Sequence, residues 1–291
     1  MEEAPTWWAK ELEQRTGGRV KVTLYYNEAL GKSFDGPKML KSGVAEIGEF
    51  SHSQPNFPML KIFHAPSVLS TNADEAKAQE AFWLLYNKGM LKELEDFRPL
   101  WWQPTGTFNP IFRNKKVTKL EELKGMKMRG LPGFGAALMD AWGATGIAMP
   151  VADVYTALER GTIDGLITVP NFAIPAKINE VTKYWLWQPA MGGGNLIIMN
   201  KKVWESFPPD IQAIVEKLSK EAEVRYAKNQ RSPAALKKIL ADIGWDVYEL
   251  SPEESARWVK AGYPVVEKWM AENEAQGLPV RQAIGILRSL K

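Results

Sequence analysis

Hydrophobic residues recur with two different periods along this chain. Every second position from residue 20 to residue 26 is apolar or aromatic, which predicts a strand with one buried face. A helix with its N-cap at Thr71-Asn72 is predicted to run to about residue 88, because apolar side chains such as Phe82 and Leu85 recur at helical spacing. Since both patterns alternate to the end of the chain, we expect an α/β protein.

The same two periods predict the other elements. With helices and strands alternating, we expect helices on both faces of largely parallel sheets. The other expected strands are residues 45–50, 100–102, 108–113, 127–129, 163–169 and 245–250, with a long extended segment at 185–199 that is interrupted by three glycines. The other expected helices are residues 7–14, 36–42, 133–142, 151–160 and 251–274.

One predicted helix is longer than the rest. It opens at Pro208-Pro209-Asp210 and continues toward Ala241, with Pro233 forcing a kink or a break. A straight helix of that length would span about 45 Å, at about 1.5 Å per residue, which exceeds one small lobe. We therefore expect this helix to brace two lobes, between which the chain crosses more than once.

Composition removes several classes of function. Hydrophobic residues make up 45% and charged residues 24%, as in ordinary globular proteins, and the net charge of +3 is scattered, which favours no nucleic-acid partner. Since there is no cysteine, thiolate chemistry and disulfides are excluded. No apolar stretch reaches the roughly 18–20 residues of a membrane span, so the protein is not expected to be membrane-embedded. Residues 1–5 do not resemble a signal peptide, and we expect any export signal to have been removed before residue 1.

Catalytic motifs are weak in this sequence. His52 and His64 lack the spacing of metal ligands and have no nucleophile elbow beside them, so they are expected to be loop or packing residues, and no metal is expected. The loop from Gly130 to Gly135 follows a strand and opens a helix, yet its G-x-x-G-x-G spacing differs from a dinucleotide fingerprint. It predicts a modest anion site at a helix N-terminus. The alternative is an α/β enzyme that uses this loop to bind a phosphate-bearing substrate.

Arg129 stands directly before that loop, at the end of a predicted strand. The carboxyl ends of strands in open α/β folds line the crevice where ligands bind. A guanidinium group there can hold a carboxylate with two parallel hydrogen bonds. A surface ion pair with a neighbouring Asp or Glu is the other interpretation, and the residues alone leave both open.

Four stretches in this order resemble the periplasmic solute-binding subunits of tripartite ATP-independent periplasmic (TRAP) transporters, the DctP-type family. The match from 149 to 165 is the most specific, and together the stretches span nearly the whole chain. They are residues 8–22 (WAKELEQRTGGRVKV), 123–129 (LKGMKMR), 149–165 (MPVADVYTALERGTIDG) and 198–208 (IMNKKVWESFP).

The resemblance implies a two-lobed periplasmic-binding-protein-like (type II) α/β fold with a long lobe-spanning helix. Lobe I is expected at 1–107 plus about 196–235, and lobe II at 108–195 plus about 236–291. The resemblance further implies a periplasmic protein that is not an enzyme and needs no cofactor. Such a protein captures a small organic acid for the membrane permease of a TRAP-type secondary transporter. Family members begin with a strand before the first helix, and we expect that strand to lie outside this sequence.

The resemblance also implies roles for individual residues. Arg129 matches the family's carboxylate clamp, whereas Asn109 stands about where a second arginine often occurs and Thr168 where an asparagine often occurs. These two departures, with the apolar side chains nearby and the 12 tryptophans, suggest a less polar ligand such as an aromatic or branched monocarboxylate. Further ligand contacts are expected from the loop after residue 50, which should face the cleft, from a residue just beyond the strand at 163–169, and from one residue of the extended segment at 185–199. These residues are Phe50, Ser51, Ser53, Asn171 and Asn195.

Overall fold

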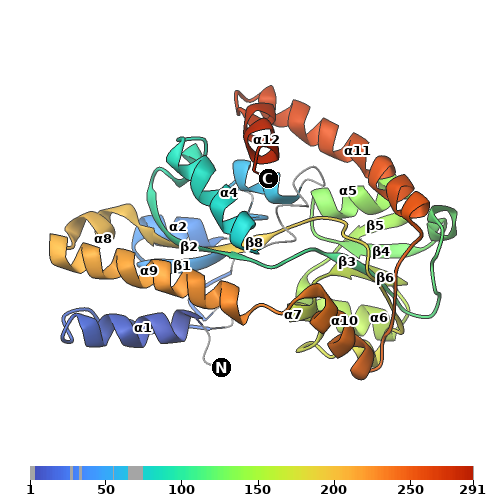
Figure 1. The fold of residues 1–291 in the computed structure, drawn as a ribbon, viewed down its shortest axis with the longest axis horizontal. Helices are drawn as coiled ribbons and strands as arrows, with labels where there is room; N and C mark the ends of the chain where they lie inside the picture. Colours follow the sequence, from blue (N-terminus) through green and yellow to red (C-terminus); the bar gives the residue numbers. More distant parts are fainter. Residues whose placement is uncertain (1–3, 27–28, 33–34, 55, 65–74, 291) are drawn as a thin grey trace. The chain divides into compact units, whose positions relative to one another are not determined.

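The computed structural model describes residues 4–26, 29–32, 35–54, 56–64 and 75–290 (Figure 1). The predicted N-cap at Thr71-Asn72 lies outside these residues. The chain folds into two compact units, each made of segments that are distant in the sequence. Unit 1 comprises Met1–Lys61, Asp74–Pro104 and Gly194–Gln230, and unit 2 comprises Ile62–Ala73, Thr105–Gly193 and Arg231–Lys291.

Unit 1 is built on a three-stranded sheet in the order β1-β8-β2, in which both pairings are antiparallel. Its helices pack on this sheet, and α1 and α9 lie side by side (Figure 1). The strands are β1 (Ile47–Ser51), β2 (Phe97–Pro104) and β8 (Gly194–Asn200). The α-helices are α1 (Ala4–Arg15), α2 (Gly36–Ser42), α4 (Glu75–Asn87), α8 (Lys201–Ser206) and α9 (Pro209–Asn229), and 3-10 turns cover Lys92–Leu94 and Met59–His64, of which the second continues into unit 2.

The core of unit 1 joins α1 and α9 to the sheet. Trp8 of α1 lies 5.7 Å from Trp101 of β2, measured between ring centroids, and Val215 and Leu218 of α9 are fully buried in the same cluster. Burying aromatic and branched side chains together removes a large apolar area from water, which stabilises the helix–sheet contact. Most tryptophans of this unit therefore serve packing.

Unit 2 is built on a six-stranded mixed sheet in the order β5-β4-β6-β3-β7-β9. Figure 1 shows α5 and α11 on one face of this sheet and α6 and α10 on the other. The strands are β3 (Asn109–Phe112), β4 (Lys127–Gly130), β5 (Thr145–Ala148), β6 (Gly165–Thr168), β7 (Tyr184–Leu186) and β9 (Asp246–Tyr248). The α-helices are α5 (Phe134–Ala141), α6 (Val154–Glu159), α7 (Pro170–Ala173), α10 (Pro233–Asp242), α11 (Pro252–Glu274) and α12 (Val280–Arg288).

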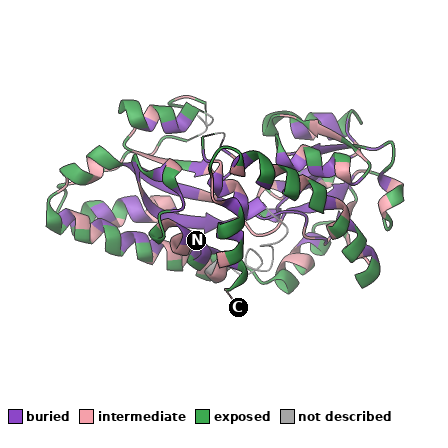
Figure 2. Cartoon of the chain, turned by 90° about the horizontal axis from the view of Figure 1, so that it is seen from above, coloured by how far each residue is buried: buried purple, intermediate pink, exposed green. Residues whose placement is uncertain are grey.

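A buried core cluster of unit 2 lies on the face covered by α6 and α10. Ile111 of β3 and Leu166 of β6 are fully buried there, against Leu158 of α6 and Leu240 of α10. Figure 2 shows the strands of both units mainly in the colour of buried residues, whereas the helices carry exposed faces. The hydrophobic face of each sheet is thus covered by amphipathic helices, as the alternating patterns predict.

Two predictions of sheet structure are wrong. Residues 20–26 form no strand in the described part of the chain, although Val20 and Val22 pack against the core of unit 1. Alternation marks which side chains are buried, but a strand also needs a hydrogen-bonding neighbour. The sheets are not largely parallel either, because unit 1 is antiparallel and β3 pairs antiparallel with both β6 and β7.

The long helix is divided in two. The chain leaves α9 at Asn229 and enters α10 at Pro233, with the Ser232 hydroxyl accepting a hydrogen bond from the N–H of Ala235. This confirms the break predicted at Pro233, since proline has no N–H to continue the helix and suits its first turn. It corrects the expectation of one brace, because α9 belongs to unit 1 and α10 to unit 2.

None of the helices in the described residues is long and apolar enough to cross a membrane.

Candidate functional site

Three predicted site residues share one face of the sheet in unit 2. Strand β6 lies between β4 and β3, and its register pairs Leu166 with Arg129 and Thr168 with Asn109. Paired residues on neighbouring strands project to the same face, and so do residues two apart on one strand. Arg129, Thr168 and Asn109 therefore lie on the face of the buried core, toward the carboxyl ends of β4 and β6.

The guanidinium group of Arg129 is buried and has no anionic partner in the part of the chain that the structure describes. The residue is 4% exposed, and Nη2 donates to the carbonyl oxygen of Met149 at 3.3 Å. Nε is buried and makes no hydrogen bond, and no ion pair joins Arg129 to a carboxylate of the described residues. Burial lowers the pKa of Arg129 to about 10, so the group stays cationic at neutral pH.

The hydrogen bond to the Met149 carbonyl oxygen also shows where the Arg129 guanidinium lies. Arg129 pairs with Ile147 on β5, and Met149 stands two residues farther on in the direction of both parallel strands. The Arg129 side chain thus extends past the level of Ile147 toward the carboxyl ends of β4 and β5. That position is the one the strand-end argument predicts for a ligand-binding arginine.

Asn109 offers a second incomplete polar group. Asn109 and Thr168 are 1% and 2% exposed and face each other across β3 and β6. The Asn109 amide nitrogen donates to the carbonyl oxygen of Thr107 at 2.8 Å, which leaves Oδ1 as a buried acceptor with no donor. A buried polar atom without a partner costs free energy, so Oδ1 would gain from a hydrogen-bond donor. That a ligand supplies this donor stays a prediction.

The sequence did not single out the cross-strand pairing of Asn109 with Thr168 or the Met149 carbonyl as a group that orients Arg129. The pairing depends on β6 lying between β3 and β4, which no local pattern reveals. Asn171, by contrast, is exposed on α7, just beyond β6. Its predicted ligand contact stays a prediction.

The predicted residues of unit 1 gather at the ends of β1 and β8. Ser51 pairs with Asn195 across these strands, and its hydroxyl lies 2.9 Å from that of Ser53. The Asn195 amide donates to the Glu49 carboxylate at 2.8 Å. These polar groups are partly exposed, so they are open to hydrogen bonding with a solute. That they contact the same ligand as Arg129 stays a prediction.

Phe50 differs from its neighbours because its ring is packed into unit 1. It is 7% exposed and lies directly against Gly36 and Gly48, where a Cβ atom would overlap the ring. Glycine at both positions makes room for the aromatic ring. This environment describes a core residue, and the predicted contact of Phe50 with ligand is untested.

Both histidines are buried, as expected of packing residues. His52 is 2% exposed, with Nδ1 2.8 Å from the carbonyl oxygen and 3.1 Å from the nitrogen of Gly194, and burial lowers its pKa to about 4. His64 is 1% exposed and lies 5.5 Å from the Phe134 ring. The lowered pKa keeps the buried His52 imidazole uncharged at neutral pH, which suits a structural role.

The loop from Gly130 to Gly135 is closed upon itself. The N–H groups of Ala136 and Ala137 donate to the carbonyl oxygens of Leu131 and Gly133, and a Cβ atom on Gly130 would overlap the backbone of Gly135. Two of the donors at this helix N-terminus are thus used within the loop. The enzyme alternative has no support from this geometry.

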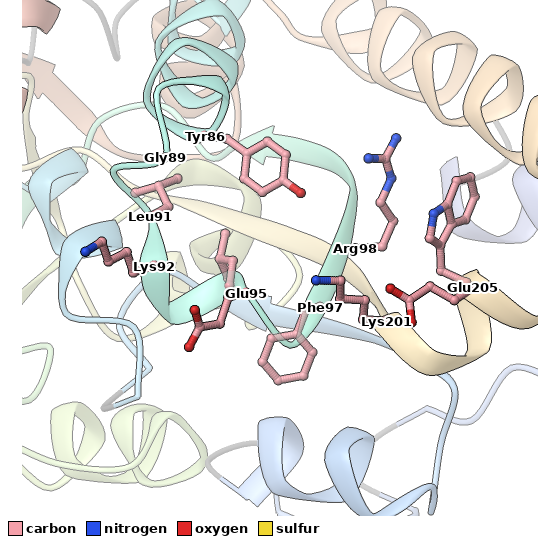
Figure 3. Close-up of a pocket in the computed structure, with 11 residues that line it drawn as sticks. Tyr86, Gly89, Leu91, Lys92, Glu95, Phe97, Arg98, Lys201 and Glu205 are labelled. Carbon is pink, nitrogen blue, oxygen red and sulfur yellow. The ribbon is translucent and has the colours of Figure 1, made fainter.

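A separate pocket of about 430 Å³ lies in unit 1 and is lined by α4, β2 and α8 residues (Figure 3). Its charges are mixed, with Lys92 and Lys201 near Glu95 and Glu205. Arg98 at its edge already binds Glu216 at 2.7 Å and stacks on Trp204. None of the predicted site residues lines this pocket.

Comparisons with known proteins support one family. The family model for bacterial extracellular solute-binding proteins, family 7 (DctP), matches residues 1–273. A solute-binding protein of Verminephrobacter eiseniae is 31% identical over 273 residues, covering 89% of this chain and 77% of that protein.

Solved structures agree in fold. A TRAP periplasmic solute-binding protein of Sulfitobacter sp. NAS-14.1 with bound β-D-galacturonate has a TM-score of 0.84 at 23% identity, over 98% of this chain and 94% of that one. A marine metagenome TRAP solute-binding protein specific for aromatic acid ligands, in complex with 3-hydroxybenzoate, has a TM-score of 0.86 at 23% identity, over 98% and 91%. The predicted two-lobed α/β fold of periplasmic binding proteins is confirmed, and the chain belongs to the DctP family of bacterial extracellular solute-binding proteins.

Proposed function

We propose that this protein captures a small organic acid in the periplasm, with Arg129 binding the carboxylate, and delivers it to the membrane permease of a TRAP-type secondary transporter. The observation that carries the proposal is the buried guanidinium of Arg129, which has a free donor and no anionic partner among the described residues. A carboxylate fits it in charge and in the planar geometry of two parallel hydrogen bonds.

Family membership supports the same conclusion. The relatives with solved structures hold carboxylates, namely galacturonate in one protein and 3-hydroxybenzoate in another. We further propose that units 1 and 2 serve as the two lobes expected from the sequence. The role is that of a receptor without a cofactor, and no catalytic group is assigned.

Calorimetry on arginine variants tests the proposal, using the ligand identified by mass spectrometry of natively purified protein. Arg129→Ala should weaken binding by roughly 30-fold to several thousandfold, since a buried charge left without its partner costs about 2–5 kcal/mol. Arg129→Lys should recover only part, because an ammonium group cannot form the planar pair.

Arg113→Ala is the matched control, since Arg113 follows β3 in the same unit and donates to the Glu159 carbonyl oxygen. It should bind as wild type does. An Arg129→Ala protein that folds normally and binds within about threefold of wild type would show that another group holds the carboxylate.

A further inference from the structure

We infer that the ligand is a monocarboxylate with a hydroxyl group at the end remote from the carboxylate, and that Asn109 Oδ1 accepts the hydroxyl hydrogen. The inference rests on the proposed function, in which Arg129 binds the carboxylate. It deepens that function by naming the class of acid and by making Asn109 the residue that selects it.

The charged groups near Arg129, Asn109 and Thr168, here called the site cluster, determine how many carboxylates the ligand can carry. Strands β3, β4 and β6 contain two charged residues, Arg129 and Lys127. Lys127 is exposed at the start of β4, where its backbone N–H donates to the Asp164 carboxylate. The Arg129 guanidinium extends toward the other end of β4, where it donates to the Met149 carbonyl oxygen. A second ligand carboxylate beside Asn109 or Thr168 would be buried without a cation from these strands, which costs several kcal/mol.

Asn109 then defines the neutral part of the ligand. Its amide nitrogen already donates to the Thr107 carbonyl oxygen, whereas the acceptor Oδ1 has no partner among the described residues. A wholly apolar ligand would leave this acceptor unsatisfied, and a carboxylate would oppose it. An ammonium donor would bury a cation that has no carboxylate within the site cluster. A hydroxyl group satisfies Oδ1 without charge.

The spacing of the strands sets the distance between the carboxylate and the hydroxyl group of the ligand. Arg129 and Asn109 stand on β4 and β3, which are separated by β6, so their strands are about 10 Å apart. The Arg129 guanidinium also reaches toward β5, on the side away from β3. An α-hydroxyl group is therefore too close to the carboxylate to reach Asn109. A spacer of about one aromatic ring or a chain of comparable length is required.

Two matched sets of acids test the inference by calorimetry on the wild-type protein. The ring set is 3-hydroxybenzoate, 3-methylbenzoate and isophthalate, and the chain set is 5-hydroxypentanoate, hexanoate and glutarate. In at least one set the hydroxy acid should bind ~10-fold or more tightly than both other members, because only it satisfies Oδ1 without adding charge. The methyl compounds match the hydroxy acids in size, so this comparison needs no variant.

Asn109→Leu assigns the preference to Asn109. It has a similar shape without the acceptor, so the preferred hydroxy acid and its methyl analogue should then bind within about twofold of each other. Asn179→Leu is the control, because Asn179 donates to the Ile243 carbonyl in the same unit and should leave the preference intact. If Asn109→Leu does not fold, the wild-type comparison still decides the class of acid.

Several outcomes overturn the inference. They are a dicarboxylate that binds as tightly as the hydroxy acid, a methyl analogue that equals it, a preference that survives in folded Asn109→Leu, or no binding by either set. When these ligands bind and Arg129→Ala abolishes that binding, the proposed function stands although the inference fails. Binding that persists in Arg129→Ala instead removes the proposed function itself.

Discussion

Arg129 differs in its surroundings from the arginines of this protein that form ion pairs. Arg257, for example, binds the Glu254 carboxylate at 2.7 Å on the surface, and its side-chain hydrogen bonds to carboxylates raise its pKa. The position of Arg129 at a strand end was readable from the sequence. The absence of carboxylates around Arg129 in the described residues could not be predicted from the sequence, because it depends on which acidic residues the tertiary fold brings near.

Gly194 shows how closely backbone and side chains pack at the start of β8. A Cβ atom there would lie 2.3 Å from the Trp102 ring and 2.8 Å from the Gln103 carbonyl oxygen. Gly194→Ala should lower the free energy of unfolding by about 1–3 kcal/mol, as overpacking does. Gly285→Ala in α12 meets no atom within 4 Å and should be stabilising by up to about 1 kcal/mol. Urea unfolding of both variants checks the contrast, and equal effects would contradict it.

Glu93 is a buried carboxyl group with a strong pH signature. Its Oε1 accepts hydrogen bonds from the N–H groups of Met59 and Leu60, at 2.8 and 3.1 Å, while burial raises its pKa to about 7 from 4.5. The folded state therefore holds this proton more tightly than the unfolded state. Its contribution to stability is present below pH 4.5 and is lost as the pH rises to 7.

Glu93→Gln should remove this dependence, because glutamine keeps the acceptor oxygen but does not ionise. At pH 8 the variant should exceed wild type by about 3 kcal/mol, and at pH 4.5 the two should be nearly equal. Urea unfolding between pH 4.5 and 8 measures the difference. His52, whose lowered pKa acts in the opposite direction over pH 4–6.5, is present in both proteins and cancels. Parallel stability curves would show that Glu93 ionises at its ordinary pKa.

Helices with explicit start signals were the elements best predicted from the sequence. Ser251-Pro252 begins α11 as expected, and the Ser251 hydroxyl accepts from the Glu254 N–H at 3.3 Å. Helix α12 was not among the helices predicted from the sequence, of which the last was 251–274. Its buried residues Val280, Ala283, Ile284 and Leu287 nevertheless have helical spacing, so the signal was present.

Ser251→Ala should lower the free energy of unfolding by about 1 kcal/mol, because it removes the side-chain acceptor from the first turn of α11. Ser289→Ala is a suitable comparison, since the Ser289 hydroxyl is at the exposed end of α12, where it donates to a backbone carbonyl. It should change stability by less than 0.5 kcal/mol, as roughly expected for a surface site. If thermal or urea unfolding gives the two variants the same stability, the cap at Ser251 contributes nothing.

Strand pairing was the part of the fold least readable from the sequence. The period of two identifies buried positions in residues 20–26, but those residues form no strand because pairing needs a neighbour. The same limit applies to the site. Arg129, Asn109 and Thr168 could each be named from the chain, whereas their gathering on one face of the sheet follows from the order β4-β6-β3. That order is a property of the tertiary fold.

At the scale of the whole molecule, the chain passes between its two units after Lys61, Ala73, Pro104, Gly193 and Gln230. Repeated crossing was expected from the absence of a polar linker. The family, the α/β fold and the receptor function were readable because four stretches spread over the chain carry the resemblance. The exact lobe boundaries are a separate matter and stay a prediction.

Ligand binding should stabilise the folded protein as a whole through the group that holds the ligand. A ligand at 100 times its dissociation constant adds about 2.7 kcal/mol if it binds only the folded state. For a chain of 291 residues this corresponds to a rise in Tm of about 5 °C. Differential scanning calorimetry with the natively bound acid should show this rise in wild type and in Arg113→Ala. It should fall below about 2 °C in Arg129→Ala at the same ligand concentration, because binding that is about 30-fold weaker or more stabilises the folded state by less than about 1 kcal/mol. An equal rise in all three proteins would mean that the ligand stabilises the fold without using Arg129.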